Sequence, residues 1–133
     1  MPTGGADRGS VLPFTAVVVA ALVACAGLAV DGGRILAARR SASAIAASAA
    51  RRGSEELAFP DLAAGRASID PARATAVAEA YLAQAGATGS VVATADDVTV
   101  TVTVRASTVV LGAFGIGSRS VTATRSAAPF GGG

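Results

Sequence analysis

The sequence contains no histidine, lysine or tryptophan, and it has only one cysteine and one tyrosine. Without histidine or lysine, serine and threonine hydroxyls lack their usual general base, so we expect no catalytic residues and no enzymatic activity. The commonest metal ligand is also missing, and we expect no metal site and no cofactor. A single cysteine excludes an intrachain disulfide and leaves the redox compartment open. With so few aromatic residues, any core must consist of Ala, Val, Leu and Ile.

The charge pattern argues against a nucleic-acid partner. The formal net charge is only +2, every basic residue is arginine, and the arginines are scattered with acidic residues between them. The adjacent Asp96 and Asp97 are interpreted as a turn, because neighbouring strand residues point to opposite faces and no third oxygen ligand accompanies them. The glycine series in 112–117 lacks the strand, helix and acidic partner of a dinucleotide site. We therefore expect no nucleic acid and no small-molecule substrate.

The most informative feature that is present is an apolar run at residues 11–30. These twenty consecutive positions carry no charged side chain. As a helix they span about 30 Å, the thickness of a bilayer's hydrocarbon core. We expect a transmembrane helix that follows a short leader, residues 1–10, and has Pro13 in its first turn. The run ends at four residues that we expect at the membrane interface, with the glycines allowing a bend: Asp31, Gly32, Gly33 and Arg34.

An alanine-rich helix is expected to continue beyond the membrane over residues 31–57. Alanine is the best helix former, and the only early interruption is the glycine pair, so we expect one long helix bent there. Leu36, Ile45 and the alanines at 42, 46 and 49 fall within one arc and form a weakly apolar face of small residues. Such a face allows close backbone approach, and we expect it to pack on the chain's own sheet or on a partner's helix.

The remainder predicts a small α+β domain at residues 70–128, after a loop at 58–69 and before a flexible tail at 129–133. Asp70 as N-cap and Pro71 at the first position predict a helix that ends at Gly86. Its expected core-facing residues, taken at helical spacing, are Ala74, Val77, Tyr81 and Ala85.

Three antiparallel strands are expected after this helix. Residues 98–104 alternate strictly between valine and threonine, which predicts one buried and one solvated face. Residues 91–95 precede them across the aspartate turn and complete a hairpin. Residues 118–126 are expected to form the third strand, with Val121 and Ala123 facing inward. The apolar, glycine-containing connection at 108–117 is either a short helix or a hydrophobic tip.

Cys25 permits two alternative interpretations of the apolar run. The segment ending at Cys25 resembles a bacterial lipobox, in which the thiol would carry lipid. Residues 24–26 also have the small-x-small form of a signal-peptidase site. Either event would yield a secreted or lipidated small binding domain whose mature chain begins near Cys25 or Gly27. The alternative to both is an uncleaved membrane helix with a buried cysteine.

The combination of these segments resembles a known family. The sequence DRGS at residues 7–10, the apolar run, the exit LAVDGGR at 28–34 and the basic, alanine-rich continuation look like the N-terminal region of TadE/TadG-like proteins of the Flp (Tad) pilus assembly system. The match covers residues 7–53, and the second half is similar to that family's variable domain with less specific motifs.

The resemblance implies a pseudopilin-like, single-pass component of the bacterial cytoplasmic membrane. Its partners would be membrane lipid and other pilus-assembly or secretion proteins, as a homo- or hetero-oligomer. Gly9 and Ser10 would flank a prepilin-type processing site. Many family members carry a glutamate before an early phenylalanine, whereas here Pro13 precedes Phe14, so the pairing of that carboxylate with a neighbour's N-terminal amine is missing. A small membrane protein that regulates an unrelated transporter would share the same anchor.

The orientation follows from two opposing arguments. Arg34, Arg39 and Arg40 follow the run and Arg8 alone precedes it, which by the positive-inside rule favours a cytoplasmic domain. A Thr/Val-rich sheet without lysine suits an extracytoplasmic structural role. We expect the C-terminal domain outside the cytoplasm.

Overall fold

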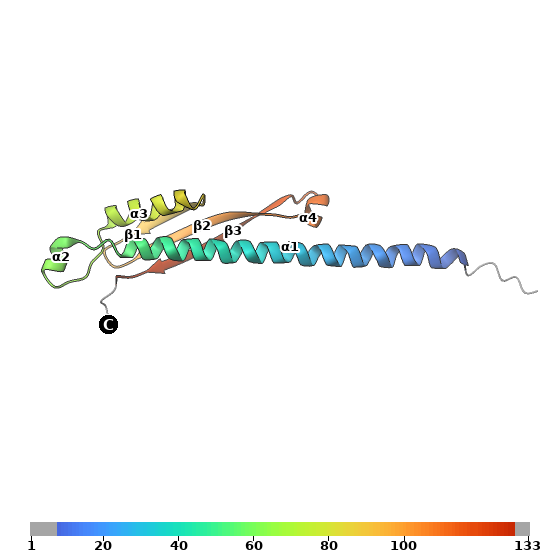
Figure 1. Ribbon diagram of the computed structural model, residues 1–133, viewed down its shortest axis with the longest axis horizontal. Helices are drawn as coiled ribbons and strands as arrows, with labels where there is room; N and C mark the ends of the chain where they lie inside the picture. Colours follow the sequence, from blue (N-terminus) through green and yellow to red (C-terminus); the bar gives the residue numbers. More distant parts are fainter. Residues whose placement is uncertain (1–7, 130–133) are drawn as a thin grey trace, which may run out of the picture.

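The computed structural model describes the backbone of residues 8–129, with side chains from residue 11 onward. One long helix, α1 (Arg8–Ser54), is followed by a short helix α2 (Phe59–Ala63), a helix α3 (Pro71–Gln84) and a three-stranded sheet. A one-turn helix, α4 (Val110–Ala113), lies between the last two strands. Figure 1 shows α1 as a rod whose C-terminal half carries the rest of the domain and whose N-terminal half extends beyond it. The predicted α+β fold is confirmed.

Helix α1 joins the apolar run to the domain without an intervening loop. It continues through Gly32 and Gly33, begins at Arg8 and ends at Ser54, three residues before the predicted end. Gly9 and Ser10 therefore lie in its first turns, whereas leader residues 1–7 and tail residues 130–133 fall outside the described chain. The apolar run and the folded domain therefore share one continuous helix.

The sheet has the order β1-β2-β3 with both pairs antiparallel. Its strands are β1 (Thr88–Ala93), β2 (Val98–Ser107) and β3 (Ser118–Ala127). The predicted alternation holds, because the valines at 98, 100 and 102 are fully buried. Their threonine neighbours form a solvent-facing ladder with β3, with hydroxyl–hydroxyl distances of 2.7 Å (Thr99–Ser126), 3.1 Å (Thr101–Thr124) and 3.2 Å (Thr103–Thr122). Paired hydroxyls of this kind stabilise a sheet's polar face.

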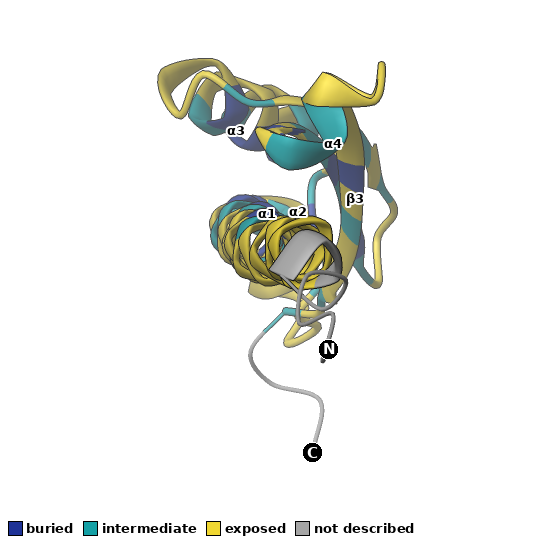
Figure 2. Ribbon diagram, turned by 90° about the vertical axis from the view of Figure 1, so that its right-hand side faces the viewer, coloured by how far each residue is buried: buried dark blue, intermediate teal, exposed yellow. Residues whose placement is uncertain are grey.

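Helices α1 and α3 both cover the valine face of the sheet (Figure 2). The predicted small-residue face of α1 packs on the chain's own sheet, since Ala42, Ala46 and Ala49 are fully buried and Ile45 is partly buried against the same core. The prediction that Leu36 belongs to this face is wrong, because Leu36 is 49% exposed. Ala50 is buried as well. With methyl groups only, the helix backbone lies close to the valines, and the core gains its density from short distances instead of large side chains.

Helix α3 begins and ends as its sequence predicts. The Asp70 carboxylate accepts hydrogen bonds from the backbone N–H groups of Ala72 (3.1 Å) and Arg73 (3.2 Å), and Gly86 has a φ of 63°, a conformation that favours glycine. The buried face differs from the prediction. It consists of Ala74, Ala78 and Leu82, while Val77 and Tyr81 lie half-buried at its flank and Ala85 is exposed. The buried residues are spaced four apart from Ala74, so the core-facing line lies one position beyond the predicted Val77 and Tyr81.

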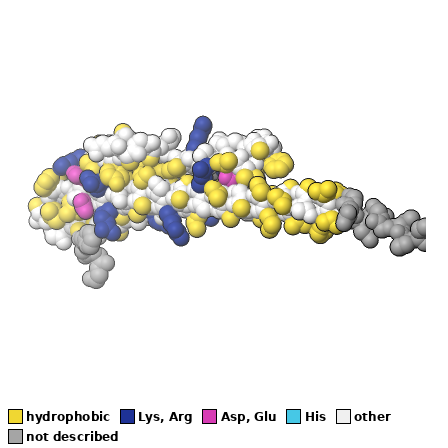
Figure 3. Space-filling model, turned by 45° about the vertical axis from the view of Figure 1, so that its right-hand side comes forward, with side chains coloured by type: hydrophobic (Ala, Val, Ile, Leu, Met, Phe, Trp, Pro, Cys, Tyr) yellow, Lys and Arg dark blue, Asp and Glu magenta, His cyan; other side chains and the backbone are white. Residues whose placement is uncertain are grey.

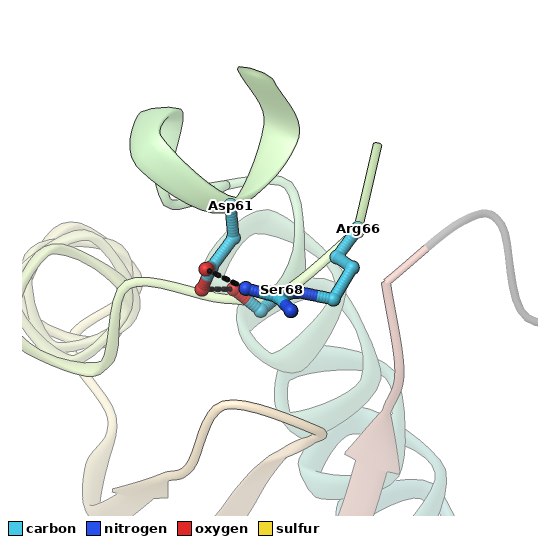
Figure 4. Close-up of polar contacts among 3 residues, drawn as sticks. All are labelled: Asp61, Arg66 and Ser68. Carbon is cyan, nitrogen blue, oxygen red and sulfur yellow. Dashed lines mark hydrogen bonds and ion pairs between the residues drawn. The ribbon is translucent and has the colours of Figure 1, made fainter. Parts of the chain in front are cut away.

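The predicted loop at 58–69 contains the one-turn helix α2, whose Asp61 holds the segment together (Figure 4). The Asp61 carboxylate accepts hydrogen bonds from the Ser68 hydroxyl (2.5 Å) and the Arg66 guanidinium (3.2 Å). These two donors, Ser68 first, lower the pKa of Asp61 below its ordinary value of 3.8. The carboxylate is therefore favoured in the folded chain.

The lowered pKa of Asp61 predicts acid sensitivity of this segment. A carboxyl group whose folded pKa is depressed contributes stability above its unfolded pKa and loses it as pH falls through the folded value. We expect residues 58–68 to lose protection from hydrogen exchange when the pH is lowered below about 4. Asp61→Asn should remove this pH dependence. Asp96→Asn, at an exposed turn residue, serves as the control; equal pH dependence in the wild type and Asp61→Asn would contradict the prediction.

Candidate functional site

The connection between β2 and β3 folds back onto α1 at the end of the apolar run. It comprises residues 108–117, here called the β2–β3 tip, and includes α4. Figure 1 shows α4 at the end of the domain that faces the free half of α1. The sequence allowed either a short helix or a hydrophobic tip, and the structure combines them: a short helix with exposed hydrophobic side chains around it.

Asp31 attaches the tip to α1. Its side chain is 1% exposed, and its carboxylate accepts three backbone hydrogen bonds from the start of α4: Val109 N–H (2.8 Å), Val110 N–H (2.9 Å) and Leu111 N–H (3.0 Å). One oxygen accepts the first bond and the other accepts the remaining two. The carboxylate thus caps α4 from another helix, because it accepts from N–H groups that have no partner within α4.

Gly27, one turn before Asp31, provides the room for this contact. A Cβ atom placed on Gly27 would overlap the Val110 side chain. Asp31 binds the backbone of the tip and Gly27 admits the Val110 side chain, so the two residues form one docking point. The apolar run therefore does not end in open space but in a contact with the distant β2–β3 connection.

The glycines at the predicted bend have a different environment. A Cβ on Gly32 or Gly33 would meet no atom within 4 Å, so packing does not require glycine there. We expect Gly33→Ala to raise stability by about 0.5–1 kcal/mol through helix propensity. Gly27→Ala should be about 1–3 kcal/mol less favourable than Gly33→Ala because of the overlap with Val110.

The test of this difference is thermal unfolding of the full chain in detergent. Trimming the neighbour, in Gly27→Ala/Val110→Ala, should recover part of the loss, because the two sites are in contact. If Gly27→Ala behaves like Gly33→Ala, α4 does not dock at this point.

The tip closes on itself at its base. Thr108 donates from its backbone N–H to the carbonyl of Gly117 (3.3 Å), and its hydroxyl donates to the carbonyl of Ile116. Beyond this closure the apolar side chains of Val109, Phe114 and Ile116 are 58%, 80% and 51% exposed. The tip is therefore held at its base and on α1, while these three apolar side chains remain more than half exposed.

The other residues singled out from the sequence lie apart from this site or beside it. The Cys25 side chain is exposed on the free half of α1, and Arg34 is exposed one turn beyond Asp31. Among the four predicted interface residues, only Asp31 is buried. The contact of Gly27 with the tip was not predicted. Its only signal in the sequence is that Gly27 lies four residues, or about one helical turn, before Asp31.

The free half of α1 has the length and composition of a membrane span. An 18-residue window has a mean hydropathy of 2.4 and none of it is buried within the protein; Figure 3 shows hydrophobic side chains over this part. One such helix near the N-terminus is compatible with a single-pass membrane protein, although signal sequences share these properties. Within residues 8–129, no three His, Cys, Asp or Glu side chains come together as metal ligands would.

The architecture defines a class, a small α+β domain built directly on one long, partly apolar helix. Comparison of the chain with protein-family models, curated proteins and solved structures found no match.

Proposed function

We propose that this protein is a membrane-anchored structural component of a Flp/Tad-type pilus-assembly or secretion apparatus, similar to TadE/TadG proteins. It acts through helix packing and subunit contacts instead of catalysis. The observation that carries the proposal is α1 itself, whose N-terminal half is apolar and uncovered while its C-terminal half is the spine of the folded domain. A rod without a linker fixes the domain's position at the membrane surface, as a structural subunit requires.

The character of the uncovered segment supports contacts with other helices. Residues 11–30 combine valine and leucine with many alanines and include Gly27. Small residues allow helices in a membrane to approach closely, where packing drives association. The exit motif at 28–34 and the alanine-rich continuation supply the link to this particular family.

The decisive experiment is affinity purification, from membranes of cells that express the protein naturally, of the full chain tagged after Gly133 and cross-linked in place. We expect pilus-assembly or secretion components to be recovered with it. The matched control replaces residues 11–26 with leucine and keeps Gly27 onward, which preserves an anchor and the docked tip but removes the native packing surface. Equal recovery from both chains, or recovery of an unrelated transporter, would contradict the proposal.

The proposed orientation places the domain outside the cytoplasmic membrane. The basic residues after the span oppose this by the positive-inside rule, and the threonine ladder supports it as a solvated, uncharged structural surface. A reporter that is active only outside the cytoplasm, fused after Gly133, should give signal. Signal from a cytoplasm-specific reporter alone would reverse the orientation.

A second candidate is a secreted or lipidated binding domain released near Cys25. One observation favours it: residues 11–26 are all exposed and Gly27 is the first residue of α1 after them that is partly covered, so cleavage after Ala26 would leave the fold and the docked tip intact. The intact mass of the purified protein separates the candidates. The anchored component retains the apolar run, with or without the first nine residues, whereas the second candidate begins near Cys25 or Gly27.

A further inference from the structure

The β2–β3 tip lies at the level where the apolar run of α1 ends. Its two anchoring residues, Gly27 and Asp31, bracket the last turn of residues 11–30. A run of twenty helical residues is about 30 Å long and matches the hydrocarbon core. If α1 spans a bilayer, the tip must therefore lie against the surface of that bilayer.

The tip's exposed side chains are unusual for a solvated loop. Single exposed apolar residues are ordinary on protein surfaces. Here Val109, Phe114 and Ile116, all more than half exposed, gather within eight residues of one short connection. They do not belong to the valine core, and a concentration of large exposed apolar side chains is typical of a surface that contacts a membrane or another protein.

The charges around the tip fit an anionic surface. Arg34 on α1 and Arg105 and Arg119 at the adjoining ends of β2 and β3 are exposed. No acidic residue occurs in 98–129, and the nearby Asp31 is buried and bonded to α4. Basic side chains at this level are positioned to meet phosphate groups of lipids.

We propose that the β2–β3 tip is a second membrane contact, in which Val109, Phe114 and Ile116 enter the interfacial layer of the bilayer. Arg34, Arg105 and Arg119 contact lipid phosphates around it. The inference rests on the membrane anchoring of α1 in the proposed function and adds that the domain is held to the surface at two points. The tip then fixes the tilt of the rod and not merely its depth.

The chain has no tryptophan, so single substitutions report on individual sites. The full chain is reconstituted in phosphatidylcholine–phosphatidylglycerol vesicles as Phe114→Trp. The matched control is Phe59→Trp, because Phe59 is 70% exposed and begins α2, which lies at the end of the domain opposite α4 (Figure 1). Phe14→Trp, within the apolar run, reports on the anchor. Lipids brominated on their acyl chains quench tryptophan in the bilayer, and acrylamide quenches it in water.

We expect brominated lipid to remove most of the emission of Phe114→Trp and Phe14→Trp, and acrylamide to remove that of Phe59→Trp. If Phe14→Trp is quenched by lipid and Phe114→Trp only by acrylamide, the tip inference fails while the anchor stands. If Phe14→Trp escapes the lipid quencher, the anchoring itself fails. Protection of Phe114→Trp from both quenchers would place a second copy of the chain over the tip and overturn the lipid assignment.

A second measurement avoids tryptophan's own preference for interfaces. In a Cys25→Ser background, Phe114→Cys and Phe59→Cys are treated with a water-soluble maleimide in the same vesicles. The far-end cysteine should react readily and the tip cysteine slowly. Equal reaction rates, with unchanged circular dichroism, would overturn the inference.

Discussion

Replacing Asp31 with alanine is expected to release the β2–β3 tip from α1. The substitution removes the only described hydrogen-bond partner of the Val109, Val110 and Leu111 N–H groups. A cap contributes about 0.5–2 kcal/mol and a bond to a charged acceptor somewhat more, so we expect a loss of about 2–3 kcal/mol in the free energy that holds the tip closed. Hydrogen exchange at these three amides should then accelerate about 30- to 150-fold.

The substitution Asp31→Asn keeps the shape of the side chain but changes its charge and its hydrogen-bonding groups. Both carboxylate oxygens accept hydrogen bonds, but an amide has only one oxygen, so Asp31→Asn turns an N–H donor toward at least one backbone N–H. We expect a smaller loss of about 1–2 kcal/mol. Asp96→Ala, at an exposed turn residue, removes the same charge and should leave these amides unchanged. Unchanged exchange in Asp31→Ala would mean that α4 is not held by this carboxylate.

The local elements of this fold could be predicted because their signals are close together in the sequence. The valine–threonine alternation at 98–104 specifies a strand with one buried face, and Asp70 and Pro71 specify a helix start. The strand boundaries extend beyond the prediction, since β2 pairs with β3 as far as Ser107. The residue types at 105–107 do not by themselves indicate a strand. They are drawn into β2 because they pair with β3 across the sheet.

The docking point could be predicted only in part. Asp31 stood out as the acidic residue that ends the apolar run, but its hydrogen-bond partners lie 78 to 80 residues away, and no local pattern indicates them. Gly27 resembles any small residue in a membrane helix until Val110 is placed beside it. Conversely, Gly32 and Gly33 are conspicuous in the sequence, yet they face open space. The glycines that are conspicuous in the sequence are therefore not the one that packing constrains, because contact with a distant segment decides which position has no room for a side chain.

The second large effect is expected from Ala46→Leu, at the centre of the contact between α1 and the sheet. Ala46 is fully buried between Ala42 and Ala50 on a face that packs against the buried valines. A larger side chain cannot be accommodated unless α1 moves away from the sheet. Overpacking of this kind costs about 1–3 kcal/mol, and for a domain of this size 1 kcal/mol lowers the melting temperature by about 4–8 °C.

The neighbouring residue provides a matched control, because Ala47 is exposed on the same helix. Ala47→Leu makes the same chemical change and should alter stability by less than about 0.5 kcal/mol. Thermal unfolding of the full chain in detergent, followed by circular dichroism, measures both variants. If both variants unfold at the same temperature, the face of α1 that packs on the sheet has been assigned wrongly. The docking of the tip at Gly27 and Asp31, which lie on the same side of the helix, would then have to be reconsidered as well.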